Sequence, residues 1–213
     1  MNGIIFDFNG TMVFDAPFHE KAWNSLAIEI NGKPLTTEQM KLTHGLPNLQ
    51  IIKQFIGDFD DDTAIQLSKR KEALYREIAK QSPDYRLVPG LEDYLAQCKR
   101  KKLPMTIASA SIYDNILFFY EHFHLDRYFK FEDIIYDNLT YSDKVQMFID
   151  ASKKINVPIK NCLIFEDSYS GIRCANQANT SEIIVIAPKR KHEEMKQFPR
   201  VSQVIENFEA LIE

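Results

Sequence analysis

The sequence predicts an α/β protein in which a parallel sheet carries helices on both faces and a helical domain is inserted after the first strand. Short apolar runs alternate with helical segments over most of the 213 residues, an order typical of parallel sheets. Between Phe14 and Pro83 this alternation stops, and only helical periodicity is found. A chain of this length can form one large core, or a core with a small second domain.

The apolar patterns place the individual elements. Strands are expected at residues 3–8, 103–109, 133–136, 161–166 and 183–187. Helices of the insertion are expected at residues 17–30, 36–43, 47–56 and 60–81. Pro83 disfavours helical conformation at Ser82, so the insertion should end there. The predicted domains are residues 1–14 with 84–213, and residues 15–83.

Composition restricts the class of protein and its ligands. The chain is 45% hydrophobic and 26% charged, as ordinary globular proteins are. Its net charge of −4 argues against broad nucleic-acid affinity, so the expected partner is a small molecule. Neither a membrane span nor a secretion signal is recognised in the sequence. The three cysteines lack metal-binding spacing, and we expect a cytoplasmic protein with reduced thiols.

The first predicted strand ends in the segment Asp7-Phe8-Asn9-Gly10-Thr11. The apolar residues before Asp7 are typical of a buried parallel strand, and Gly10 permits a tight turn after it. The Asp7 carboxylate should therefore lie at the C-terminal edge of the sheet, where open α/β sheets bind ligands. The alternative is an aspartate that only forms a turn or caps a helix.

Two more predicted strands end in polar residues. Glu166 and Asp167 are adjacent, so one carboxylate can face a metal ion while the other steadies its surroundings, and clustered oxygen ligands suit Mg²⁺. Ser109 and Ala110 end another strand, where a hydroxyl and backbone N–H groups can hold phosphate oxygens at a helix N-terminus. Alternatively, Asp167 or Ser109 only caps the helix that follows it.

The order of these segments resembles the haloacid dehalogenase-like (HAD) hydrolases, whose first motif is Asp-x-Asp-Gly-Thr. The resemblance implies a Rossmann-like core with an inserted α-helical cap domain, Mg²⁺ as cofactor and Asp7 as the nucleophile. It implies that Ser109 contacts phosphate. It assigns the metal to Asp7, Glu166, Asp167 and, through its backbone carbonyl, Asn9. The proton-transferring second aspartate of the motif is replaced here by Asn9.

The resemblance extends to a lysine and to the insertion. Lys144, 23 residues before Asp167, is chosen as the lysine that neutralises nucleophile and phosphate; the alternative is an exposed lysine at a helix start. The insertion resembles the cap of the β-phosphoglucomutase-like subgroup, which implies that His19 and Lys71 contact substrate. Otherwise His19 is a surface residue, and Lys71, the only charge on an apolar stripe, extends to water.

These resemblances predict a Mg²⁺-dependent phosphatase that acts on a small phosphate monoester, with a sugar phosphate expected, through an aspartyl-phosphate intermediate. Asn9 is expected to reduce its activity. The alternatives are a phosphomutase and a catalytically weak phosphometabolite-binding protein. The mutases carry an arginine in the loop corresponding to residues 44–50, where this chain has none, which favours hydrolysis. A dehalogenase is disfavoured because it does not require the Glu166–Asp167 metal site. A monomer is expected.

Overall fold

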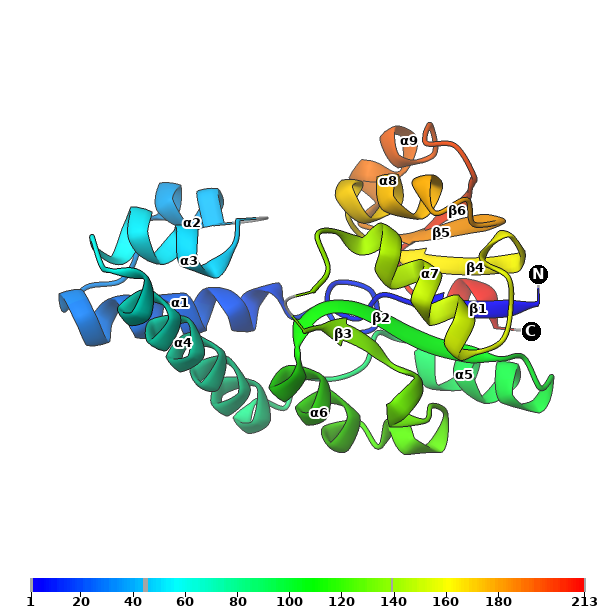
Figure 1. Ribbon diagram of the computed structural model, residues 1–213, viewed down its shortest axis with the longest axis horizontal. Helices are drawn as coiled ribbons and strands as arrows, with labels where there is room; N and C mark the ends of the chain where they lie inside the picture. Colours follow the sequence, from blue (N-terminus) through cyan, green and yellow to red (C-terminus); the bar gives the residue numbers. More distant parts are fainter. Residues whose placement is uncertain (1, 44–45, 139, 213) are drawn as a thin grey trace. The chain divides into compact units, whose positions relative to one another are not determined.

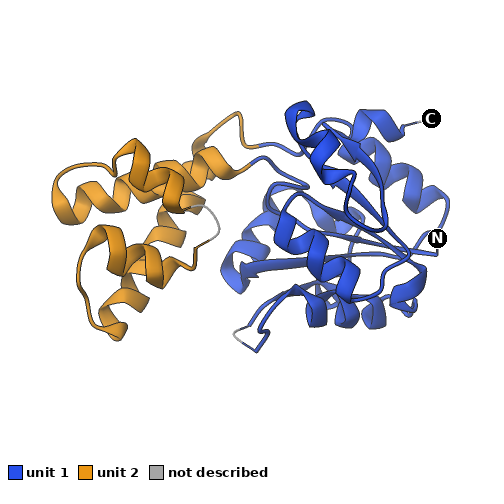
Figure 2. Ribbon diagram, turned by 90° about the horizontal axis from the view of Figure 1, so that it is seen from above, with its two compact units in different colours: residues 1–14, 86–213 blue, residues 15–85 orange. Residues whose placement is uncertain are grey.

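The computed structural model describes residues 2–43, 46–138 and 140–212. The chain divides into two compact units (Figure 2). Unit 1 comprises Met1–Phe14 with Arg86–Glu213, and unit 2 comprises Asp15–Tyr85. The sequence places the second border at residue 83. Unit 2 extends two residues further, to Tyr85, and the Tyr85 hydroxyl lies 3.0 Å from that of Tyr75 in the same unit.

Unit 1 is built on a six-stranded parallel sheet with the order β3-β2-β1-β4-β5-β6. The strands are β1 (Gly3–Phe6), β2 (Met105–Ile112), β3 (Ile135–Asp137), β4 (Cys162–Glu166), β5 (Glu182–Ile186) and β6 (Val201–Ile205). The five predicted strands are found. The sixth, β6, was missed because this edge strand exposes Ser202 and Gln203, which weakens its apolar pattern.

Helices cover both faces of the sheet (Figure 1). Helices α7 (Lys144–Lys154) and α8 (Tyr169–Gln177) lie on one face, and α5 (Leu91–Arg100) and α6 (Tyr113–His122) lie on the other. A short helix, α9 (His192–Met195), precedes β6. Single 3₁₀ turns occur at Leu125–Arg127, Phe131–Asp133, Ile159–Asn161, Lys189–Lys191 and Phe208–Leu211. This arrangement confirms the predicted α/β class.

Alternate residues of the central strands build two cores. Ile5 and Ile164 pack on the side of α7 and α8, and both are fully buried. On the other side Phe6 stacks on Phe165 with ring centroids 5.0 Å apart, and Tyr94 of α5 meets Phe6 edge-on at 6.4 Å. Each buried side chain of this size contributes about 1.5–3 kcal/mol to stability. The ends of β1 and β4 are therefore firmly fixed.

Unit 2 is helical, as the sequence predicts. It contains α1 (Ala16–Asn31), α2 (Thr37–Thr43), α3 (Asn48–Ile51), a π-helical turn (Ile52–Ile56) and α4 (Asp61–Gln81). The helix predicted at 47–56 is thus one α-helical turn that widens into a π-helical turn before Gly57. Ser82 is extended, as the following proline requires. The helices in the described part of the chain lack the combination of length and apolar character that crossing a bilayer needs.

Candidate active site

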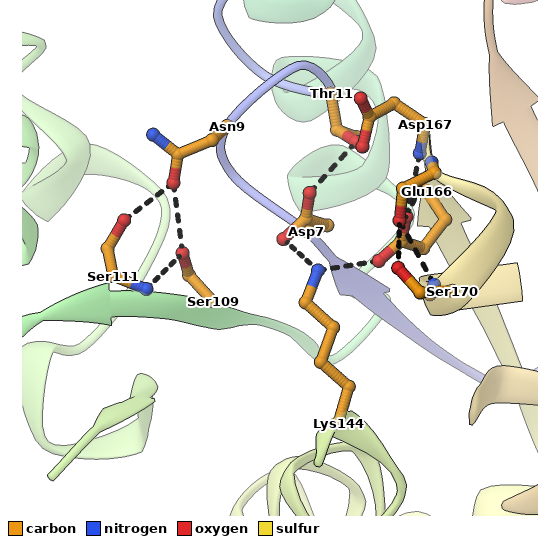
Figure 3. A network of polar contacts seen from close by, with 11 residues as sticks. Asp7, Asn9, Thr11, Ser109, Ser111, Lys144, Glu166, Asp167 and Ser170 are labelled. Atoms are coloured by element: carbon orange, nitrogen blue, oxygen red, sulfur yellow. Dashed lines mark hydrogen bonds and ion pairs between the residues drawn. The ribbon is translucent and has the colours of Figure 1, made fainter. Parts of the chain in front are cut away.

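The carboxyl ends of β1, β2 and β4 bring together the site residues predicted for unit 1 (Figure 3). Asp7 directly follows β1, and its backbone N–H donates to the carbonyl of Phe165 at 2.9 Å. Because Phe6 pairs with Phe165 in parallel register, Asp7 lies beside Glu166, the last residue of β4. Both carboxylates are buried, with exposed fractions of 3% and 0%. The alternative of Asp7 as a simple cap or turn residue does not account for this burial.

Lys144 lies between the two carboxylates. Its Nζ donates to Asp7 Oδ1 at 2.7 Å and to Glu166 Oε1 at 2.6 Å. The lysine is the first residue of α7, where Asp143 is the N-cap and accepts the backbone N–H of Val145 at 2.8 Å. Although it starts a helix, the Lys144 side chain is only 17% exposed. The alternative of an exposed lysine at a helix start is therefore wrong.

Glu166 is held by the turn that follows it. Its Oε2 accepts the backbone N–H groups of Asp167 and Ser168, both at 2.9 Å, and the Ser168 hydroxyl at 3.0 Å. Ser168 is also the N-cap of α8, so the alternative of Asp167 as the cap is wrong. A Cβ at Gly171 would lie 1.8 Å from Glu166 Oε1, so only glycine lets the helix pass this close to the carboxylate.

Three carboxylates at this edge offer a site for a cation. Asp7, Glu166 and Asp167 each present one oxygen, and these oxygens lie within 4.8 Å of one another. Gly10 lets the loop after β1 approach this group, since its φ is +77° and a Cβ there would lie 2.2 Å from Asp167 Oδ2. A small cluster of carboxylate oxygens is the donor set that Mg²⁺ prefers, so the residues fit the implied metal.

The charges of this cluster depend on one another. Burial raises the pKa of Asp7 to about 7; Lys144 opposes this rise and Glu166 adds to it. Burial would also raise the pKa of Glu166, but Lys144 and the backbone N–H groups of the following turn outweigh it and hold that pKa below its ordinary value. For Lys144 burial favours the neutral amine, yet the two carboxylates raise its pKa. Lys144 and Glu166 therefore form a charged pair, beside which Asp7 is readily protonated.

Asn9 faces away from Lys144 and towards β2 (Figure 3). Its Oδ1 accepts the Ser111 hydroxyl at 2.6 Å and the Ser109 hydroxyl at 3.3 Å. β2 is irregular between Ser109 and Ile112, and the backbone N–H of Ser111 donates to Ser109 Oγ at 3.2 Å. Ala110 is exposed between the two serines.

Ser109 differs in its local structure from the prediction. It lies within β2 and not at a helix N-terminus, because the strand continues to Ile112, which is the N-cap of α6. The alternative of Ser109 as a helix cap is wrong for the same reason. Sequence reasoning missed Ser111 and gave no role to Thr11, whose hydroxyl donates to Asp7 Oδ2 at 3.3 Å. The Ser-x-Ser spacing was a signal, since residues i and i+2 of a strand share a face.

In unit 2, His19 and Lys71 are brought together. Lys71 is 2% exposed, and its Nζ lies 2.7 Å from His19 Nδ1 and 2.9 Å from Glu72 Oε1. Burial lowers the pKa of Lys71, and Glu72 opposes this effect. The alternative of a lysine that extends to water is therefore wrong. The His19 side chain is 28% exposed, and its ring stacks on Tyr75 at 4.0 Å, so it is more than a plain surface residue.

The surroundings of this pair were not predicted. Glu72 is buried beside Lys71 and accepts Asn48 Nδ2 at 2.7 Å. On the other side His19 Nε2 lies 3.4 Å from Asp15 Oδ2, which also accepts the Tyr75 hydroxyl at 3.0 Å. Glu72, next to Lys71 but outside the apolar stripe, is therefore a second buried charge of α4. The missed signal was an acidic residue directly next to the lysine.

The comparisons with known proteins agree with this fold. Residues 4–185 match the family described as haloacid dehalogenase-like hydrolase, and the chain belongs to this family. Among solved structures, a HAD hydrolase of family IA, variant 3, from Entamoeba histolytica is 33% identical. The alignment covers 99% of this chain and 95% of that one, with a TM-score of 0.90. The predicted family is thereby confirmed.

Two further similarities are informative. A "Phosphorylated carbohydrates phosphatase" of Thermotoga maritima is 24% identical over 86% of this chain and 84% of that protein. A β-phosphoglucomutase from Clostridium difficile has a TM-score of 0.75 at 21% identity, covering 99% of this chain and 93% of the other. The second similarity concerns the fold alone.

Proposed function

We propose that this hydrolase is a Mg²⁺-dependent phosphatase that acts on a small phosphorylated sugar through a phosphoryl group carried by Asp7. The observation that carries the proposal is the Lys144 ammonium, 2.7 Å from Asp7, beside three carboxylates spaced for a cation. The similarity to the phosphorylated carbohydrates phosphatase of Thermotoga maritima supports a phosphorylated carbohydrate as the substrate class.

Asp7 is proposed to attack the phosphorus. A bond forms between a carboxylate oxygen of Asp7 and phosphorus, the bond from phosphorus to the sugar oxygen breaks, and water later hydrolyses the aspartyl phosphate. Lys144 neutralises negative charge beside Asp7, because its ammonium is already fixed there by two carboxylates. The Ser109 hydroxyl and the backbone N–H of Ala110 are proposed to hold phosphate oxygens.

Asp7, Asp167 and the backbone carbonyl of Asn9 would hold Mg²⁺. The ion supplies positive charge that offsets repulsion between the phosphate and the carboxylates. Glu166 is assigned mainly to the surroundings of the metal, since its Oε1 accepts Lys144 and its Oε2 accepts two backbone N–H groups.

Unit 2 is proposed to contribute to substrate choice through His19 and Lys71. The partly buried hydrogen bond between them, and the buried contact of Lys71 with Glu72, would fix the ammonium at low conformational cost. The absence of arginine between residues 44 and 50 is read from the sequence, and His44 and Gly45 lie outside the described residues. It favours a phosphatase over a mutase.

Asn9 favours one alternative, a catalytically weak protein that binds a phosphometabolite. An amide cannot protonate the leaving alkoxide or take a proton from water, and general acid–base catalysis is worth about 10²–10⁴-fold in rate. The contacts proposed for phosphate and metal do not use the Asn9 side chain. Binding should therefore persist even where turnover is slow.

A panel of sugar phosphates, assayed for phosphate release with Mg²⁺ and with excess chelator, tests the proposal. Release should require Mg²⁺ and should be lost in Asp7→Ala while the circular dichroism spectrum is retained. Phosphate release that survives chelator, or that survives Asp7→Ala, would overturn the assignment. Mg²⁺-dependent binding of phosphate without turnover would favour the binding-protein alternative.

A further inference from the structure

Asn9 is followed by Gly10, the residue pair in which asparagine loses its side-chain amide most readily. Glycine has no side chain to hinder its backbone nitrogen from reaching the side-chain carbonyl carbon of the preceding asparagine. We propose that Asn9 is a site of spontaneous deamidation. The aspartate formed at position 9 would supply the proton-transferring carboxylate that the protein lacks while this residue is asparagine. The activating effect rests on the proposed function, whereas the deamidation itself does not.

The hydroxyl groups around Asn9 favour this reaction. Ser111 and Ser109 both donate to Oδ1, at 2.6 Å and 3.3 Å. These donors withdraw electron density from Cγ and stabilise the negative charge that develops on Oδ1 as a nucleophile adds, as an oxyanion hole does. After reaction the same donors would hold a carboxylate, and hydrogen bonds to an ionised acceptor are roughly twice as strong as neutral ones. The two serine hydroxyls therefore stabilise both the charge that develops during deamidation and the carboxylate of the product.

The turn around Gly10 controls when the reaction occurs. The Gly10 backbone N–H donates to the carbonyl of Val13 at 2.8 Å, and Asn9 and Val13 form an isolated bridge. The nitrogen must leave this hydrogen bond before it can attack. Asn9 and Gly10 are both partly exposed, so water can reach them. Deamidation is thus expected from a locally open turn, more slowly than in the unfolded chain.

The step balances with water as the only co-reactant. The Gly10 nitrogen loses its proton to solvent and bonds to Asn9 Cγ. The bond from Cγ to the side-chain nitrogen then breaks, and that nitrogen takes a proton from solvent and leaves as ammonia. Water then opens the resulting succinimide ring. Cleavage of the bond between Cγ and nitrogen restores the normal backbone and gives aspartate, whereas cleavage at the main-chain carbonyl gives isoaspartate.

The chain contains a matched internal control in the pair Asn31-Gly32. Here the side-chain nitrogen of Asn31 donates to the carbonyl of Ile56 at 2.8 Å, and the Gly32 N–H donates to the carbonyl of Ile28 at 2.9 Å. The backbone nitrogens of Gly10 and Gly32 are therefore both hydrogen-bonded, and the two glycines have similar φ angles of +77° and +69°. The two pairs differ in the serine hydroxyls that donate to Asn9 Oδ1, and in that Asn31 ends helix α1 and donates its side-chain nitrogen. Comparison of the wild-type protein with its Ser111→Ala variant isolates the effect of the hydroxyl.

The test incubates the folded protein at mildly alkaline pH and follows both pairs by peptide mass spectrometry that separates aspartate from isoaspartate. Aspartate should accumulate at position 9, and Ser111→Ala should slow this conversion relative to that at Asn31. Phosphatase activity should rise in parallel towards that of an Asn9→Asp variant, by up to about 10²–10⁴-fold. An Asn31→Ser variant should show the same rise, and Asn9→Gln should show none.

Three results would overturn the proposal. The first is that position 9 remains asparagine while Asn31 converts. The second is that isoaspartate is the only product at position 9. The third is that aspartate forms at position 9 without a gain in phosphatase rate, although the Asn9→Asp variant is active. The proposed function fails separately: an Asn9→Asp variant that hydrolyses no phosphate ester would overturn that function and the activating role, whatever the mass spectra show at position 9.

Discussion

Removing the charge of Asp7 should stabilise the fold, although it should destroy activity. The pKa of Asp7 rises from its ordinary value of 3.8 to about 7 because the carboxyl is buried, even with Lys144 beside it. Ionising Asp7 therefore opposes folding. Full ionisation of Asp7 lowers the free energy of unfolding by roughly 4 kcal/mol, since each pKa unit corresponds to about 1.4 kcal/mol.

The sign of the pH dependence follows from this rise. A group whose pKa is higher in the folded state contributes stability that is fully present below 3.8 and is lost as the pH rises through about 7. Asp7→Asn retains an oxygen that accepts from Lys144 but cannot ionise. In excess chelator, the variant should match the wild type near about pH 4 and exceed it by up to roughly 4 kcal/mol near about pH 8.

Urea unfolding of both proteins across this pH range measures the difference directly. Glu166→Gln is the matched control with the opposite sign, because Lys144 and backbone N–H groups hold the pKa of Glu166 below its ordinary value. Glu166 contributes stability above about pH 4.5 that is lost as the pH falls through its folded pKa, so this variant should be less stable at neutral pH. A stability difference between Asp7→Asn and wild type that does not change with pH would refute the reasoning.

The remaining predictions concern activity. Asn9→Asp should raise kcat by about 10²–10⁴-fold with little change in KM, because the proton moves in the transition state; steady-state kinetics with the best ester measure this. Asp167→Ala should abolish Mg²⁺-dependent turnover and weaken Mg²⁺ binding in calorimetry, with circular dichroism unchanged. Lys144→Met should lower kcat by about 10²–10³-fold, as loss of one charge-stabilising donor does, and Lys144→Arg should recover part of the rate. Lys71→Met should change kcat/KM by different factors for different sugar phosphates, and a uniform factor would argue against a role in substrate choice.

The core of the candidate site could be predicted because it depends on strand ends. The C-terminal ends of parallel strands meet at one edge of a sheet, so the sequence positions of Asp7 and Asp167, each one residue beyond its strand, placed both at that edge. The resemblance to the family then assigned them to one metal site. Lys144 begins a helix, and only the resemblance to the family separated it from an exposed lysine. Its burial depends on two carboxylates from distant strands.

The missed features depend on local irregularity and on tertiary packing. Ser111 lies beside Asn9 at the irregular end of β2, and the apolar pattern does not encode this irregularity; the Ser-x-Ser spacing was the one signal that pointed to Ser111. Glu72 is buried because Lys71 and Asn48 satisfy one of its oxygens, and a sequence pattern assigns an acidic residue to the surface by default. β6 was missed because two of its residues are exposed at the sheet edge.

The central claim, that Asp7 carries the phosphoryl group, can be tested by trapping it. p-Nitrophenyl phosphate has a leaving group that needs no proton, so Asn9 should slow mainly the later attack of water on the aspartyl phosphate. The wild-type protein, with asparagine at position 9, is mixed with this ester and Mg²⁺ and quenched rapidly in acid. Mass spectrometry should then find phosphate on the peptide that contains Asp7, and less phosphate on the same peptide of the Asn9→Asp variant. Release of phosphate with an unmodified Asp7 peptide in both proteins, or labelling that persists in chelator, would contradict the account.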